Sequence, residues 1–190
     1  EYNASNVNQN YFAGTQTTIQ LATYDGGDSL HLIPNPDGGL GVYFQNVQIV
    51  YNDTLYFGYI NSSGILQLAT FAGDSIKLYP NPDASTNGEA GSFRVFRNSL
   101  YGLYLNAAGV FQFAKVTPAG LSLISNPDNS IYGFVNDFAV IYNDRICARY
   151  VNAAGVAVLA TYDGNQWTMW PNPDNTNYGF QAIFPVVFNN

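Results

Sequence analysis

Four aspartates recur in one short motif, and their even spacing makes them the first candidates for a functional role. Asn-Pro-Asp stands in LIPNPDGG, LYPNPDAS, LISNPDNS and MWPNPDNT, and the motif starts at positions 35, 81, 126 and 172. Its carboxylates belong to Asp37, Asp83, Asp128 and Asp174. Carboxylates can bind cations or ligand hydroxyls. In a turn, however, Pro fixes φ and Asp accepts hydrogen bonds from the amides that follow. The motif therefore has an architectural interpretation, which we favour, beside a functional one.

Aromatic side chains near these motifs form the second set of candidates. Trp167 and Trp170 precede the fourth motif, while Tyr132 and Tyr178 follow the third and the fourth. Sugar sites commonly combine an aromatic face, which packs on C–H groups, with Asn and Asp side chains that bind hydroxyls. The alternative for all four rings is ordinary packing between repeat units. The sequence predicts a ligand surface made of the four aspartates and these four aromatic residues.

Catalytic signals are sparse. His31 is the only histidine and Cys147 the only cysteine, and neither lies in a recognisable nucleophile motif. Carboxylate pairs could serve a glycosidase, but the recurring ones have the architectural interpretation. We therefore predict that the protein is not an enzyme. Calcium is a weak alternative, since segments 25–28 and 174–177 carry oxygen ligands without the spacing of an EF-hand loop. No cofactor is expected.

These side chains must be positioned by a repeated, strand-rich unit. LATYDG at 21–26 returns at 159–164, and VYNDTLYFGYINSSG at 50–64 matches VFRNSLYGLYLNAAG at 95–109 and IYNDRICARYVNAAG at 141–155. Each unit contains four short alternating runs bounded by turn residues, as in 138–142, 145–151, 156–162 and 166–170. Asn-Asp at 52–53 and 143–144 suits tight hairpins. The predicted fold is all-β.

Four such units favour a four-bladed β-propeller of four-stranded antiparallel blades. We expect a single domain over 1–190, with repeats near 1–46, 47–92, 93–137 and 138–183. Residues 184–190 would complete the first blade, so that pairing of the N- and C-terminal strands closes the ring and hides both sheet edges. The crossovers and the Asn-x-x-Gly hairpins at 61–64, 106–109 and 152–155 would then share one face.

The motifs Y-N-D-T-L-Y-F at 51–57 and L-x-x-x-D-G at 21–26 and 159–164 bear a family resemblance. The chain resembles secreted bacterial β-propeller repeat proteins, whose blades carry F-N-G-T-L-Y-F and L-W-x-T-D-G motifs. It is similar to hemopexin-type domains in the number of units alone. The resemblance implies an exported propeller, secreted or at the cell surface, and supplies no catalytic residues.

Composition limits the partners. The net charge is −7, and the six basic residues are scattered, so no phosphate-binding surface is expected and nucleic acid is an unsuitable partner. The chain contains no run of eighteen apolar residues, so membrane insertion is not expected. The first hypothesis is a non-catalytic module that binds a glycan or another small polar ligand on the crossover face. The second is a structural or protein–protein interaction scaffold. The chain is expected to be a monomer or a homodimer.

Overall fold

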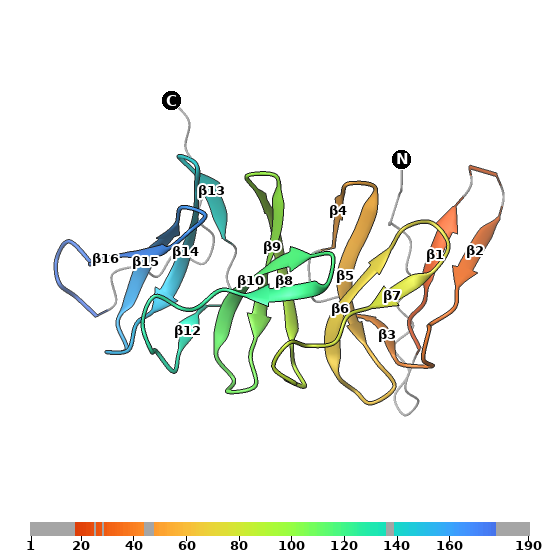
Figure 1. Cartoon of the computed structure of the whole chain (residues 1–190), viewed down its shortest axis with the longest axis horizontal. Coiled ribbons are helices and arrows are strands. Elements are labelled where there is room, and N and C mark those ends of the chain that lie inside the picture. Colours follow the sequence, from red (N-terminus) through yellow and green to blue (C-terminus); the bar gives the residue numbers. More distant parts are fainter. Residues whose placement is uncertain (1–17, 25, 28, 44–47, 136–138, 178–190) are drawn as a thin grey trace.

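The computed structural model describes residues 18–177 apart from 25, 28, 44–47 and 136–138. Within these ranges every regular element is a β-strand, so the predicted all-β class is confirmed. The strands group into four successive units that stand side by side in chain order (Figure 1). Unit 1 contains β1 (Leu21–Tyr24) and β2 (Leu30–Ile33).

The other three units are larger. Unit 2 contains β3 (Gly41–Tyr43), β4 (Ile49–Tyr51), β5 (Thr54–Ile60), β6 (Leu66–Phe71) and β7 (Ile76–Leu78). Unit 3 contains β8 (Glu89–Phe96), β9 (Ser99–Leu105), β10 (Phe111–Thr117) and β11 (Gly120–Leu123). Unit 4 contains β12 (Gly133–Phe134), β13 (Val140–Tyr142), β14 (Arg145–Val151), β15 (Ala157–Tyr162) and β16 (Trp167–Trp170). The four runs predicted between 138 and 170 correspond to β13–β16, with boundaries that shift by up to two residues.

Each larger unit is an antiparallel sheet with one repeated order. In unit 3 the order is β8-β9-β10-β11. Unit 2 has β3 and β4 on β5, followed by β6 and β7, and unit 4 has β12 and β13 on β14, followed by β15 and β16. Neighbouring units are joined where a new unit begins, through single parallel pairs such as Phe111↔Gly133 and Ile19↔Gly41.

Hydrophobic cores lie between the units, because alternate residues of a strand face opposite neighbours. In β5, Phe57 and Tyr59 pack towards unit 1, whereas Tyr56 packs towards unit 3. Three clusters result, one at each junction, and the largest joins units 3 and 4. A strand buried on both faces explains why the chain is rich in apolar residues yet forms no single central core.

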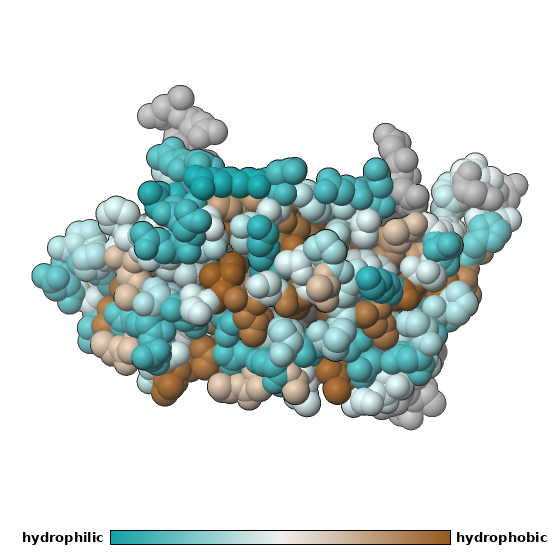
Figure 2. Space-filling view, in the orientation of Figure 1, coloured by the Kyte–Doolittle hydropathy of each residue, from teal (hydrophilic) through white to brown (hydrophobic). Residues whose placement is uncertain are grey.

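Tight turns occupy one edge of the row, the upper edge in Figure 1. Both residues of the turns 52–53, 97–98 and 143–144 have positive φ, between 46° and 56°. This confirms the predicted Asn-Asp hairpins, since that conformation suits Asn and Asp. Arg97 adopts it as well, and its guanidinium makes an ion pair with Asp144. Figure 2 shows hydrophilic residues gathered along this edge.

The opposite edge carries the four Asn-Pro-Asp turns and the three Asn-x-x-Gly hairpins, as predicted. We call it the crossover edge. The predicted closure into a four-bladed ring depends on strands within residues 1–17 and 178–190, which lie outside the described residues. Closure therefore stays a prediction, and so does the boundary of the first repeat.

Candidate functional site

Each of the first three Asn-Pro-Asp turns is fastened to the next unit by its aspartate. Asp37 accepts a hydrogen bond from the hydroxyl of Tyr59 at 2.7 Å, and its other oxygen accepts one from the backbone N–H of Ser62 at 2.9 Å. It also accepts from the N–H of Gly39 at 3.0 Å, which is the predicted turn contact. One carboxylate thus holds its own turn, a buried tyrosine and the following hairpin.

The same arrangement repeats at the next two junctions. Asp83 accepts from Tyr104, from the N–H of Ala107 at 2.7 Å and from that of Ser85 at 3.1 Å. Asp128 accepts from Tyr150, Ala153 and Ser130. We call this three-part contact the aspartate–tyrosine lock. All three tyrosines have 0% exposure, so each hydroxyl proton needs an acceptor within the protein, and the aspartate supplies it.

The pKa shifts of the paired aspartates and tyrosines agree with a structural role for the lock. Burial alone would raise the pKa of Asp37, Asp83 and Asp128, but the hydrogen bonds from tyrosine and backbone donors outweigh it and the pKa is lowered. The pKa of the three tyrosines is raised by burial and by the hydrogen bond to the carboxylate. At neutral pH the pair is an ionised acceptor with a neutral donor, which is the combination that the lock requires.

The fourth aspartate differs from the other three. Asp174 accepts from the N–H of Thr176 at 3.1 Å and from its hydroxyl at 2.9 Å. Within the described ranges no tyrosine bonds to it, and its side chain is exposed. The hydrogen bonds from Thr176 lower its pKa. Among the four predicted carboxylates, Asp174 is the one whose described hydrogen bonds all come from its own turn.

The predicted aromatic residues are not gathered in one place. Trp167 packs in the core between units 3 and 4, with its ring centroid 4.4 Å from that of Phe134 and 5.2 Å from that of Phe113. Trp170 is 51% exposed, and its indole N–H donates to the hydroxyl of Thr161 at 3.0 Å. Tyr132 is 53% exposed and lies against the hairpin at Gly155. Tyr178 lies outside the described residues.

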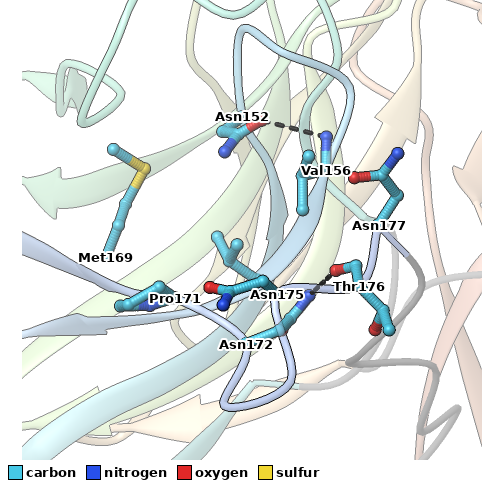
Figure 3. Close-up of a pocket in the computed structure, with 9 residues that line it drawn as sticks. Asn152, Val156, Met169, Pro171, Asn172, Asn175, Thr176 and Asn177 are labelled. Atoms are coloured by element: carbon cyan, nitrogen blue, oxygen red, sulfur yellow. Dashed lines mark hydrogen bonds between the residues drawn. The ribbon is translucent and has the colours of Figure 1, made fainter.

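A pocket opens at the crossover edge of unit 4, in the region shown in Figure 3. Its volume is about 350 Å³. Val156, Val158, Met169 and Pro171 form its apolar part. Amide and hydroxyl side chains complete the lining: Asn152, Asn172, Asn175, Thr176 and Asn177. None of these described lining residues is charged.

Sequence reasoning missed the tyrosines of the lock. It named the asparagines of the pocket only as parts of hairpin 152–155, of the fourth Asn-Pro-Asp motif and of the possible calcium segment 174–177. The tyrosines had a signal, since each stands 21 or 22 residues after its aspartate. The pocket had none before the turn was folded. Of the two predicted calcium segments, 25–28 contains undescribed residues, and 174–177 forms part of the pocket and its rim. Among the described residues no three of His, Cys, Asp or Glu are grouped as metal ligands.

Comparisons with known proteins add no relative. No protein-family model matches the chain, and no curated protein matches it. No helix in the described ranges is long and apolar enough to cross a membrane. The function must therefore be argued from the geometry of the crossover edge.

Proposed function

We propose that this protein is a non-catalytic binding module that recognises a glycan or another small polar ligand at its crossover edge. The observation that carries the proposal is the repeated aspartate–tyrosine lock. It uses the carboxylates of Asp37, Asp83 and Asp128 internally, and it fixes each hairpin rigidly to the preceding turn. A rigid edge that presents amides and hydroxyls binds with little loss of conformational entropy. An exported location, secreted or at the cell surface, belongs to the same proposal.

The exposed ring of Tyr132 offers an apolar platform beside the polar hairpin of unit 4. An apolar surface next to amides suits sugars, because one side of a sugar ring is apolar and its rim carries hydroxyls, and an aromatic face is one way to supply it. We place the ligand near this hairpin for that reason. Trp170 and Asp174 belong to the same unit and are also exposed.

A thermal-melt screen against neutral and anionic saccharides, with calcium and chelator as further conditions, tests the proposal. A ligand that binds the folded state raises the melting temperature by mass action. We expect a rise with a saccharide that is reduced in Tyr132→Ala. Tyr142→Ala is the matched control, since Tyr142 is 47% exposed on the tight-turn edge and should change nothing. A panel without any rise would contradict the binding module.

A structural or protein–protein interaction scaffold is the second candidate, and the complete internal use of three carboxylates favours it. Carboxylates whose hydrogen bonds are all made within the protein hold its units together and are not free to contact a ligand. A flat saccharide panel together with capture of a defined protein partner, lost when hairpin 152–155 is replaced by the sequence of hairpin 61–64, would support this candidate over the first.

We further infer that the four units close into a propeller ring. Support comes from the repeated junction, which uses both faces of every internal sheet and leaves a further junction to be formed by the two end units. Solution scattering distinguishes the arrangements. A compact chain of this length has a radius of gyration of about 16 Å. A markedly larger value for the monomer would contradict closure.

A further inference from the structure

A hydrogen bond that is present in both unit 2 and unit 3 is missing from the matching place in unit 4, beside the pocket. In unit 2, the side-chain nitrogen of Asn61 donates to Oε1 of Gln67 at 3.2 Å. In unit 3, that of Asn106 donates to Oε1 of Gln112 at 2.8 Å. Each glutamine stands six residues after its asparagine. In both units the side-chain oxygen of the glutamine therefore accepts a hydrogen bond from the asparagine amide.

Unit 4 has Val158 where the other two units have glutamine. Asn152 still caps its hairpin, because its Oδ1 accepts from the N–H of Ala154 at 3.0 Å and of Val156 at 2.9 Å. Its Nδ2, however, has no acceptor within the part of the chain that the structure describes. Figure 3 shows this nitrogen pointing away from the backbone N–H of Val156. The exchange thus leaves two amide hydrogens available to a ligand.

The rim supplies further groups of the same kind. Asn175 and Asn177 are exposed, and their side chains make no hydrogen bond with another described residue. Asn172 is different, since its Nδ2 donates to Ala157 O at 3.0 Å and to Thr176 O at 2.6 Å. It holds the rim in place. The pocket therefore combines a fixed frame with amides that both donate and accept.

We infer that this pocket binds a neutral saccharide of one or two rings, through Asn152, Asn175 and Asn177 over an apolar floor of Val156, Val158 and Met169. The inference rests on the proposed binding function and gives it a site and a ligand class. The volume of about 350 Å³ lies at the small end of ligand pockets. Sugar hydroxyls donate and accept as amides do, and sugar C–H groups suit the floor.

Other ligand classes fit the lining less well. An anion would need a cationic or otherwise positive partner, but none of the described lining residues is charged and the chain carries a net charge of −7. A nucleobase would need an aromatic ring for stacking, and the part of the lining that the structure describes contains none. A purely apolar ligand would leave the amides without partners, which costs free energy.

The test uses the full chain and titrates neutral mono- and disaccharides, with anionic sugars for comparison, by calorimetry. We expect a Kd between about 10 µM and 1 mM for a neutral sugar, from the size of the ligand. Val158→Gln introduces the glutamine that units 2 and 3 have at this place. Its side-chain oxygen should accept the hydrogen bond from Nδ2 of Asn152, and saccharide binding should become at least about tenfold weaker. Its melting temperature without ligand shows that the variant is folded.

Gln112→Val is the matched control, because it makes the opposite exchange in unit 3 and leaves the pocket of unit 4 intact. Its affinity should equal that of the wild type. Saccharide binding that survives Val158→Gln would overturn this site and leave the binding module standing. Preference for anionic sugars would overturn the ligand class. Absence of binding by any saccharide would overturn the pocket and the glycan function together.

Discussion

Replacing Asp83 by Ala is expected to destabilise the protein by about 3 kcal/mol or more, because one carboxylate serves three donors. The hydroxyl of Tyr104, which has 0% exposure, would lose its partner, and so would the N–H groups of Ala107 and Ser85. In a chain of this size the loss corresponds to a fall of roughly 6–12 °C in melting temperature. Thermal and urea unfolding measure it.

Asp174→Ala is the internal control for this experiment. The residue occupies the same place in its turn, but its described partners are the N–H and hydroxyl of Thr176 alone. We expect a cost of about 1 kcal/mol or less. A loss from Asp174→Ala as large as that from Asp83→Ala would contradict the conclusion that Asp174 contributes only to its own turn.

The pH dependence of stability separates the lock from simple packing. The pKa of Asp83 is lowered in the folded state, against about 3.9 for an unfolded aspartate. Its contribution is therefore present above pH 4 and is lost as the pH falls through the folded pKa. The wild type should lose stability in acid more steeply than Asp83→Ala. Tyr104, whose pKa is raised, adds a contribution that is present below pH 10 and is lost as the pH rises further.

Gly133→Ala is expected to cost about 3–5 kcal/mol or to prevent folding, because the site combines positive φ with a steric clash. Gly133 has φ of +71°, and a Cβ there would lie 2.3 Å from the carbonyl oxygen of Phe111 and 2.7 Å from Cγ1 of Val110. This is the point where unit 4 pairs with unit 3. Neither atom can retreat without disturbing the junction.

Gly109→Ala supplies the comparison, since Gly109 has φ of +75° and nothing within 4 Å of the added Cβ. This variant should lower the free energy of unfolding by about 1–2 kcal/mol, which is the cost of placing alanine at positive φ. Equilibrium unfolding of both variants measures the difference, and soluble yield replaces it where Gly133→Ala does not fold. A Gly133→Ala protein as stable as Gly109→Ala would mean that the close approach of the two units is not required.

Much of the fold was predictable because its signals are local. Alternation of apolar and polar residues gave β13–β16 of unit 4, and Asn-Asp gave two of the tight turns, whereas β3 and β12, the fifth strands of units 2 and 4, were not predicted. The turn at 97–98 was missed, because Arg97 is an unusual residue for positive φ and an ion pair with Asp144 accompanies it. The turn contacts of the Asn-Pro-Asp motif were also foreseen, since an aspartate and the amides that follow it are neighbours in the chain.

The candidate site was predicted in part. The crossover edge was correctly expected to carry both the turns and the hairpins. The roles within it were not all foreseen: Trp167 packs against Phe113 and Phe134, and three of the four aspartates bind tyrosines of the next unit. The pocket depends on Val158, which reads as an ordinary strand residue until the glutamines at the same place in other units are seen bonded to asparagine.

The sequence by itself determined the repeat, the all-β class, the turn types and the edge at which polar residues gather, because these depend on contacts between residues a few positions apart. Only the tertiary structure decided which carboxylates accept hydrogen bonds from the next unit and which side-chain amide is left for a ligand. The carboxylates depend on partners in neighbouring units, more than twenty residues away. Those pairings follow from the docking of one sheet on the next, and no local pattern specifies them. The amide depends on the residue six positions later, which reaches it only when the hairpin has folded.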